Sequence, residues 1–73
     1  MTNIVTPQAI DLSSILARLN GDLSHALRVS DLAYARKCAA IAWFISRENS
    51  SMPVRAIQAR ASAVCRFLEA SHV

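Results

Sequence analysis

The sequence is short of the residues that interrupt helices and turn a chain sharply. Its 73 residues include one glycine, Gly21, and two prolines, Pro7 and Pro53. Alanine is abundant, and β-branched residues are scattered along the chain. Because tight turns need glycine or proline and alanine favours helix over sheet, this composition predicts an all-α fold.

A long hydrophobic run is also missing. The longest apolar run, CAAIAWFI at residues 38–45, has eight residues and is too short to cross a bilayer. The start, MTNIVTPQAID, lacks the basic and apolar stretches of a signal peptide. Hydrophobic residues make up 53% of the chain, which is too many for intrinsic disorder. We therefore expect a folded cytoplasmic protein that does not bind membranes.

Residues suited to catalysis or metal binding are few and far apart. Cys38 and Cys65 form no C-x-x-C pair, and we expect both to be small buried apolar residues with reduced thiols. Neither His25 nor His72 has a carboxylate partner in the sequence, and no nucleophile motif or phosphate-binding loop is present. We expect no enzymatic activity, no metal or other cofactor, and no small-molecule substrate.

Apolar periodicity predicts a small bundle of three main helices with a possible short fourth. Residues 1–5 carry no pattern and are expected to be disordered, so residues 6–73 form a single helical domain. Thr6 and Pro7 are predicted to start the first helix, and Asn20-Gly21 to stop it. Its apolar stripe consists of Leu12, Ile15, Leu16 and Leu19.

Further helix signals follow Gly21. Asp22 is a candidate cap for the short helix, which could also merge with the next one, and Ser30 is another candidate cap. Residues 31–47 read as one helix that is apolar around most of its circumference, which is typical of the middle of a bundle. After the turn ENSSM, capped by Ser51 or Met52, Pro53 opens a last helix that reaches about Ala70. Its stripe is Val54, Ile57, Ala61, Val64 and Leu68.

The net charge of +3 is concentrated in the second half of the chain. Residues 36–73 hold six basic and two acidic side chains, whereas residues 1–35 hold two basic and three acidic ones. Five of the six basic residues are arginines, which make bidentate contacts with carboxylates and phosphates. An acidic partner, protein or nucleic acid, would fit this charge, although an ordinary solubility charge explains it equally well.

A candidate partner-binding surface lies on the predicted helix at 31–47. Arg36, Ala40, Trp43 and Arg47 follow one another at spacings of four, three and four residues and form the only polar strip of that helix. Tryptophan and arginine are enriched at binding hot spots. The strip therefore predicts an exposed Trp43 with an arginine rim for a protein with an acidic or apolar surface, extended by Tyr34 and Lys37. Alternatively, Trp43 belongs to the core, packed against the first helix or the tail, and the arginines are merely solvated.

The turn at residues 48–52 admits a second interpretation, a DNA-reading helix-turn-helix. Residues 35–60, ARKCAAIAWFISRENSSMPVRAIQAR, resemble the DNA-binding domain of the bacterial replication initiator, in which an Ala-rich helix, a polar turn and a Pro-started helix follow one another. The family's Asp-His-Ser-Thr signature does not follow here; ASAVCRFLEA continues the helix. In this interpretation the last helix contacts nucleic acid through Arg55, Gln58, Arg60, Ser62 and Arg66.

Three functions are compatible with these patterns. We favour a small regulatory protein that binds a larger protein machine, such as the host transcription machinery, and inhibits or otherwise modulates it. Its size and lack of catalytic groups are similar to those of compact regulators that phages and plasmids encode. The alternatives are a helix-turn-helix transcription regulator and a structural subunit or secretion co-chaperone that is stable only with its partner.

Overall fold

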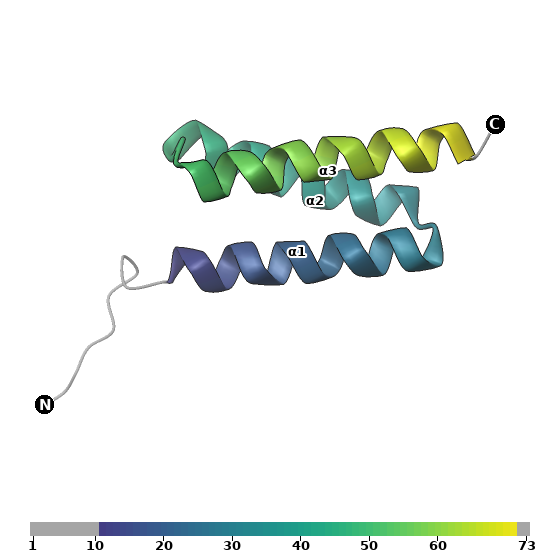
Figure 1. The fold of residues 1–73 in the computed structure, drawn as a ribbon, viewed down its shortest axis with the longest axis horizontal. Helices are drawn as coiled ribbons and strands as arrows, with labels where there is room; N and C mark the ends of the chain where they lie inside the picture. Colours follow the sequence, from purple (N-terminus) through teal and green to yellow (C-terminus); the bar gives the residue numbers. More distant parts are fainter. Residues whose placement is uncertain (1–10, 72–73) are drawn as a thin grey trace, which may run out of the picture.

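Three α-helices make up most of residues 11–71, the part of the chain that the computed structural model describes. They are α1 at Leu12–Val29, α2 at Leu32–Glu48 and α3 at Met52–Ser71. The helices run side by side and the chain reverses at each of the two connections; α1 and α3 lie in front in Figure 1, with α2 behind them. The predicted all-α bundle is confirmed. Within the described residues there is no short fourth helix.

The first helix begins after Asp11, whose side chain caps it. One carboxylate oxygen accepts hydrogen bonds from the Ser13 backbone N–H at 3.0 Å and the Ser13 hydroxyl at 2.8 Å. The other accepts from the Ser14 hydroxyl at 3.1 Å. These hydrogen bonds, chiefly those from Ser13, hold the pKa of Asp11 below its usual range. The predicted start at Thr6 and Pro7, like the prediction for residues 1–5, lies outside the described residues.

The predicted helix stop at Asn20-Gly21 is wrong, because α1 continues to Val29. Leu23 and Ala26, beyond the glycine, are completely buried and continue the stripe of Leu16 and Leu19. Burying a leucine side chain contributes about 2 kcal/mol, which exceeds the cost of roughly 1 kcal/mol for a glycine inside a helix. Asp22 therefore lies within α1 and caps no short helix.

Ser30, rather than Gly21, is the left-handed residue that ends α1. Its φ is 58° and its ψ 41°, and the Asp31 backbone N–H donates to the Ala26 carbonyl at 2.9 Å. The predicted helix cap at Ser30 is thus wrong. Asp31 caps α2 instead, since its carboxylate accepts from the Tyr34 backbone N–H at 3.0 Å.

Only one side of α2 is buried, although the helix is apolar around most of its circumference. Ala35, Cys38 and Ala42 form this buried side, whereas Ile41, another of the apolar residues around the circumference, is 48% exposed. The physical reason is that a bundle of three helices has no central position. Each helix touches the other two over part of its surface and leaves the remainder to solvent.

The second and third helices form an antiparallel hairpin. Residues 49–51 connect them, and the Asn49 side chain accepts from the Ser51 backbone N–H at 2.9 Å. The Arg55 N–H donates to the Ser51 carbonyl at 3.0 Å, in agreement with the predicted helix start. Near the far end of the hairpin, Arg36 of α2 and Glu69 of α3 form an ion pair at 3.0 Å. The turn is therefore a bundle corner between two helices packed along their length.

The core follows this hairpin and the inner side of α1. On α3, the buried side chains confirm most of the predicted stripe, with Ile57 only partly buried. Leu23, Val54 and Leu68 are the largest side chains that are completely enclosed. No helix within residues 11–71 is both long enough and apolar enough to span a membrane.

The position of Gly21 inside α1 makes Gly21→Ala a stabilising change. The φ of Gly21 is not positive, and, apart from the backbone of its own helix, no atom lies within 4 Å of the position that a Cβ would take. We expect the free energy of unfolding to rise by about 0.5–1 kcal/mol, since alanine restricts the unfolded chain more than glycine does. Urea unfolding followed by circular dichroism measures this change.

The matched variant is Ser30→Gly, which places glycine at the residue that does adopt a left-handed conformation. It should also stabilise the protein, by about 1 kcal/mol, because glycine carries no Cβ penalty there. Destabilisation by Gly21→Ala would mean that α1 ends at the glycine after all.

Candidate functional site

The arginine-tryptophan strip, Arg36, Ala40, Trp43 and Arg47, lies along the surface of α2. All four residues are exposed, and 52% of the surface of Trp43 is accessible to solvent. The Arg47 guanidinium carbon is 5.1 Å from the centre of the Trp43 ring, within the range of a cation–π contact. The indole is thus held against an arginine while much of it faces water.

Phe44 enlarges the apolar part of this surface and was missed in the sequence. Its ring meets that of Trp43 edge-on, with the centroids 6.1 Å apart and an interplanar angle of 71°, and Phe44 itself is 65% exposed. Its position in the helix is the signal that could have identified it. Consecutive helical residues are about 100° apart, which places Phe44 outside the buried stripe. Two neighbouring exposed aromatic rings form a small apolar patch.

Arg36, at the start of the strip, is paired with a residue of α3. Its guanidinium donates to the Glu69 carboxylate at 3.0 Å, and both side chains are largely exposed. An exposed pair of this kind contributes little to stability. It nevertheless shows which parts of α2 and α3 lie opposite each other.

The two remaining residues predicted for this surface, Tyr34 and Lys37, do not lie beside Trp43. Tyr34 faces α1, where its ring meets His25 edge-on at 6.1 Å, and a hydrogen bond to the Asp22 carboxylate raises the pKa of its hydroxyl. Lys37 is exposed, but its position in the helix is about a third of a turn away from Trp43. The strip therefore consists of the two arginines, Ala40 and Trp43.

The residues of the alternative nucleic-acid surface are divided between two sides of α3. Arg55, Ser62 and Arg66 are exposed, and their spacings of seven and four residues place them on one face. Gln58 is half-buried.

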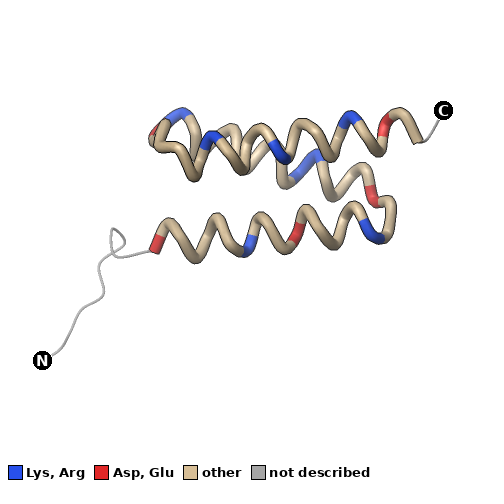
Figure 2. The backbone as a smooth tube through the Cα atoms, in the orientation of Figure 1, with Lys and Arg blue, Asp and Glu red and all other residues tan. Residues whose placement is uncertain are grey.

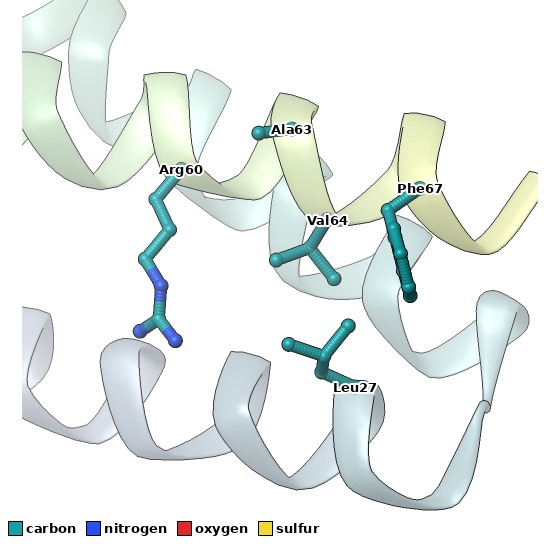
Figure 3. A pocket seen from close by; sticks show the side chains of 5 residues that line it. All are labelled: Leu27, Arg60, Ala63, Val64 and Phe67. Atoms are coloured by element: carbon teal, nitrogen blue, oxygen red, sulfur yellow. The ribbon is translucent and has the colours of Figure 1, made fainter.

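Arg60, the fifth of these residues, points to α1 (Figure 3). It donates to the Asn20 carbonyl at 3.2 Å, to the Asn20 side-chain oxygen, and to the Ser24 hydroxyl at 3.0 Å. It therefore connects α3 to α1 and is not available on the face that holds Arg55.

The charges of the three helices are unevenly distributed. Figure 2 shows basic residues recurring along α2 and α3, whereas acidic and basic residues alternate along α1. The basic half predicted from the sequence thus becomes one side of the bundle, the α2–α3 hairpin.

An apolar groove of about 360 Å³ lies on another side of the bundle, between α1 and α3 (Figure 3). It is lined by Leu27, Arg60, Ala63, Val64 and Phe67. Its only charged group, Arg60, is the one already hydrogen-bonded to α1. The groove offers apolar contact but no convergent set of polar groups for a small molecule.

The cysteines and His25 are engaged in packing and local contacts. Cys38 is buried and Cys65 half-buried, both as free thiols, and burial is the main cause that raises the pKa of each. His25 lies against Tyr34 and 3.4 Å from an Arg28 nitrogen. Among residues 11–71 no cluster of His, Cys, Asp or Glu side chains could hold a metal ion.

Comparisons with known proteins add no relative. No protein-family model matches this sequence, and no curated protein or solved structure is significantly similar to it. The site must therefore be interpreted from its own geometry.

The connection through Arg60 predicts that Arg60→Ala destabilises the fold. Its three hydrogen bonds join α3 to α1 at a partly buried position, and their loss should lower the free energy of unfolding by roughly 1–2 kcal/mol. Urea unfolding measures the change. Arg55→Ala, on the exposed face of α3, is the matched control and should change stability by less than about 0.5 kcal/mol. Equal effects would refute a structural role for Arg60.

The exposure of Trp43 predicts its fluorescence directly, because it is the only tryptophan of the chain. We expect red-shifted emission in the native protein and efficient quenching by acrylamide, approaching that of the urea-unfolded chain. Blue-shifted emission that acrylamide barely quenches would show instead that the indole is enclosed.

Proposed function

We propose that this protein is a non-enzymatic regulator that binds a larger protein through the arginine-tryptophan strip of α2 and thereby modulates its activity. The transcription machinery of a host cell is the partner that we consider first. The observation that carries the proposal is the exposed indole of Trp43 with the Arg47 guanidinium 5.1 Å from its ring centre.

An exposed tryptophan held in this way favours a role in partner binding over a role in the apolar core. A lone tryptophan in a small bundle normally contributes its large apolar area to the core. Here, small side chains such as Ala35 and Ala42 occupy the buried side of α2, and Trp43 lies outside it. A partner that covers the indole would remove apolar surface from water, and Arg36 and Arg47 at the rim would select acidic groups around it.

The nucleic-acid alternative retains one supporting observation, the exposed Arg55, Ser62 and Arg66 on one face of α3. The arrangement of the helices weighs against it. In a helix-turn-helix the second helix crosses the first at about 90–120° and projects into the major groove. In this protein, α3 lies antiparallel to α2 and buries Val54, Ala61 and Leu68 along its length.

The test is capture of partners by the tagged protein from cell lysates, quantified by mass spectrometry. Trp43→Ala should reduce the recovery of a specific partner by at least about tenfold, as expected for a hot-spot residue. Phe67→Ala is the matched control, since it removes another exposed aromatic ring, in the groove between α1 and α3, and should preserve recovery.

Two results would contradict the proposal. The first is a partner whose recovery does not depend on Trp43. The second is tight binding of duplex DNA that weakens steeply as salt rises and is insensitive to Trp43→Ala, which would support the nucleic-acid alternative.

A further inference from the structure

The strip on α2 has a parallel row of exposed residues on α3. Arg55, Ser62, Arg66 and Glu69 are spaced by seven, four and three residues, and all four are exposed. The ion pair between Arg36 and Glu69 joins one end of each row. Because α2 and α3 are antiparallel, moving along α2 from Arg36 corresponds to moving back along α3 from Glu69, which brings Ser62 opposite Trp43.

The two rows together form one surface, which we call the two-helix face. At a rise of about 1.5 Å per residue, the row on α2 is about 16 Å long and the row on α3 about 21 Å. Between the arginines the surface holds small side chains, Ala40 and Ser62, together with the partly exposed Cys65. Small side chains at these positions permit the close approach of another helix, whose axis would lie about 8–10 Å from each of its neighbours.

The bundle already shows how a helix occupies this hairpin. On one side, α1 packs against both α2 and α3 with Leu16, Leu19 and Leu23. The two-helix face lies on the other side of the same hairpin, where no described helix covers it (Figure 1). It differs from the inner side in having charged residues around its large apolar anchor, Trp43.

The charges of the two-helix face specify the chemistry of the occupant. Four arginines, Arg36, Arg47, Arg55 and Arg66, accompany a single acid, Glu69, which Arg36 already neutralises. A second copy of this chain would bring like charges together across a two-fold axis, which disfavours self-association. Complementarity requires carboxylates or phosphates at the edges and an apolar group at the centre.

An acidic helix satisfies these requirements better than a nucleic acid does. A phosphate backbone would leave the apolar surface of Trp43 and Phe44 without an apolar partner. One face of the indole is already next to Arg47, which limits base stacking to the other. An amphipathic helix supplies apolar anchors and flanking carboxylates together.

We propose that the two-helix face binds an amphipathic helix of the partner protein that carries carboxylates on both sides of an apolar stripe. This inference rests on the proposed function and adds the chemistry of the partner and the contribution of α3. Trp43 accepts the apolar stripe, Arg47 contacts one row of carboxylates, and Arg55 and Arg66 contact the other.

The test uses a synthetic helix-forming peptide of about 15 residues with a leucine stripe flanked by glutamates, and a matched peptide with glutamine at those positions. Trp43 fluorescence is the readout, since the indole lies in the proposed interface. We expect a saturable blue shift with the glutamate peptide and binding weaker by at least about tenfold with the glutamine peptide.

Charge reversals distinguish the two-helix face from general attraction between opposite charges. Arg47→Glu and Arg66→Glu, one on each helix, should each weaken binding of the glutamate peptide by about tenfold. Arg28→Glu makes the same charge change at an exposed position on α1 and should weaken it by less than about twofold. Equal effects of the three reversals would overturn the proposal, and so would an effect of Arg47→Glu without one of Arg66→Glu.

The outcomes separate this inference from the proposed function. Partner capture that depends on Trp43, combined with equal binding of the glutamate and glutamine peptides, would overturn the acidic helix and leave the regulator in place. If neither capture nor peptide binding depends on Trp43, both proposals fail. Duplex or single-stranded DNA of about 20 nucleotides, bound more tightly than the peptide and weakened by the same two reversals, would assign the face to nucleic acid instead.

Discussion

The contact between α2 and α3 is the constraint on which the rest of the molecule depends. It is the most extensive contact between helices, and much of it is made by small side chains, Ala35, Cys38 and Ala42 on α2 and Ala61 on α3. Small residues allow two helix backbones to approach closely along their length, and the short connection at residues 49–51 makes the hairpin antiparallel. The first helix then supplies the larger leucines that close the remaining side. No described charged or polar residue is fully buried, so the core itself consists of apolar side chains.

A core built largely from small residues leaves the larger apolar side chains outside. Trp43, Phe44 and Phe67 are all more than half exposed, while Ala and Val occupy much of the interior. Three helices of this length cannot enclose every apolar residue of a chain that is 53% hydrophobic. The exposed aromatic rings are therefore a consequence of the architecture, and they give a small protein apolar surface for binding another molecule.

The position of an arginine relative to the hairpin decides whether it joins two helices or remains exposed for binding. Arg60 is directed between α3 and α1, where Asn20 and Ser24 take up its donors. Arg55 and Arg66, on the same helix, face away from α1 and keep their guanidinium groups in water. Arginines that look alike in the sequence thus have different roles. The face of a helix that meets its neighbours depends on how all three helices pack.

The sequence by itself determined the helical class, the position of the turn at residues 49–51 and the periodic burial along α3, whereas it left open whether Trp43 is exposed or packed. These follow from local propensity and from a period of 3.6 residues, which act within one helix. Only the tertiary structure decided that α1 passes through Gly21, that Ile41 and Phe44 face solvent and that Tyr34 turns to α1. Each depends on which neighbour is within reach. Burial of Leu23 and Ala26 outweighs the local glycine signal, and the Arg36–Glu69 contact, 33 positions apart, has no counterpart in any local pattern.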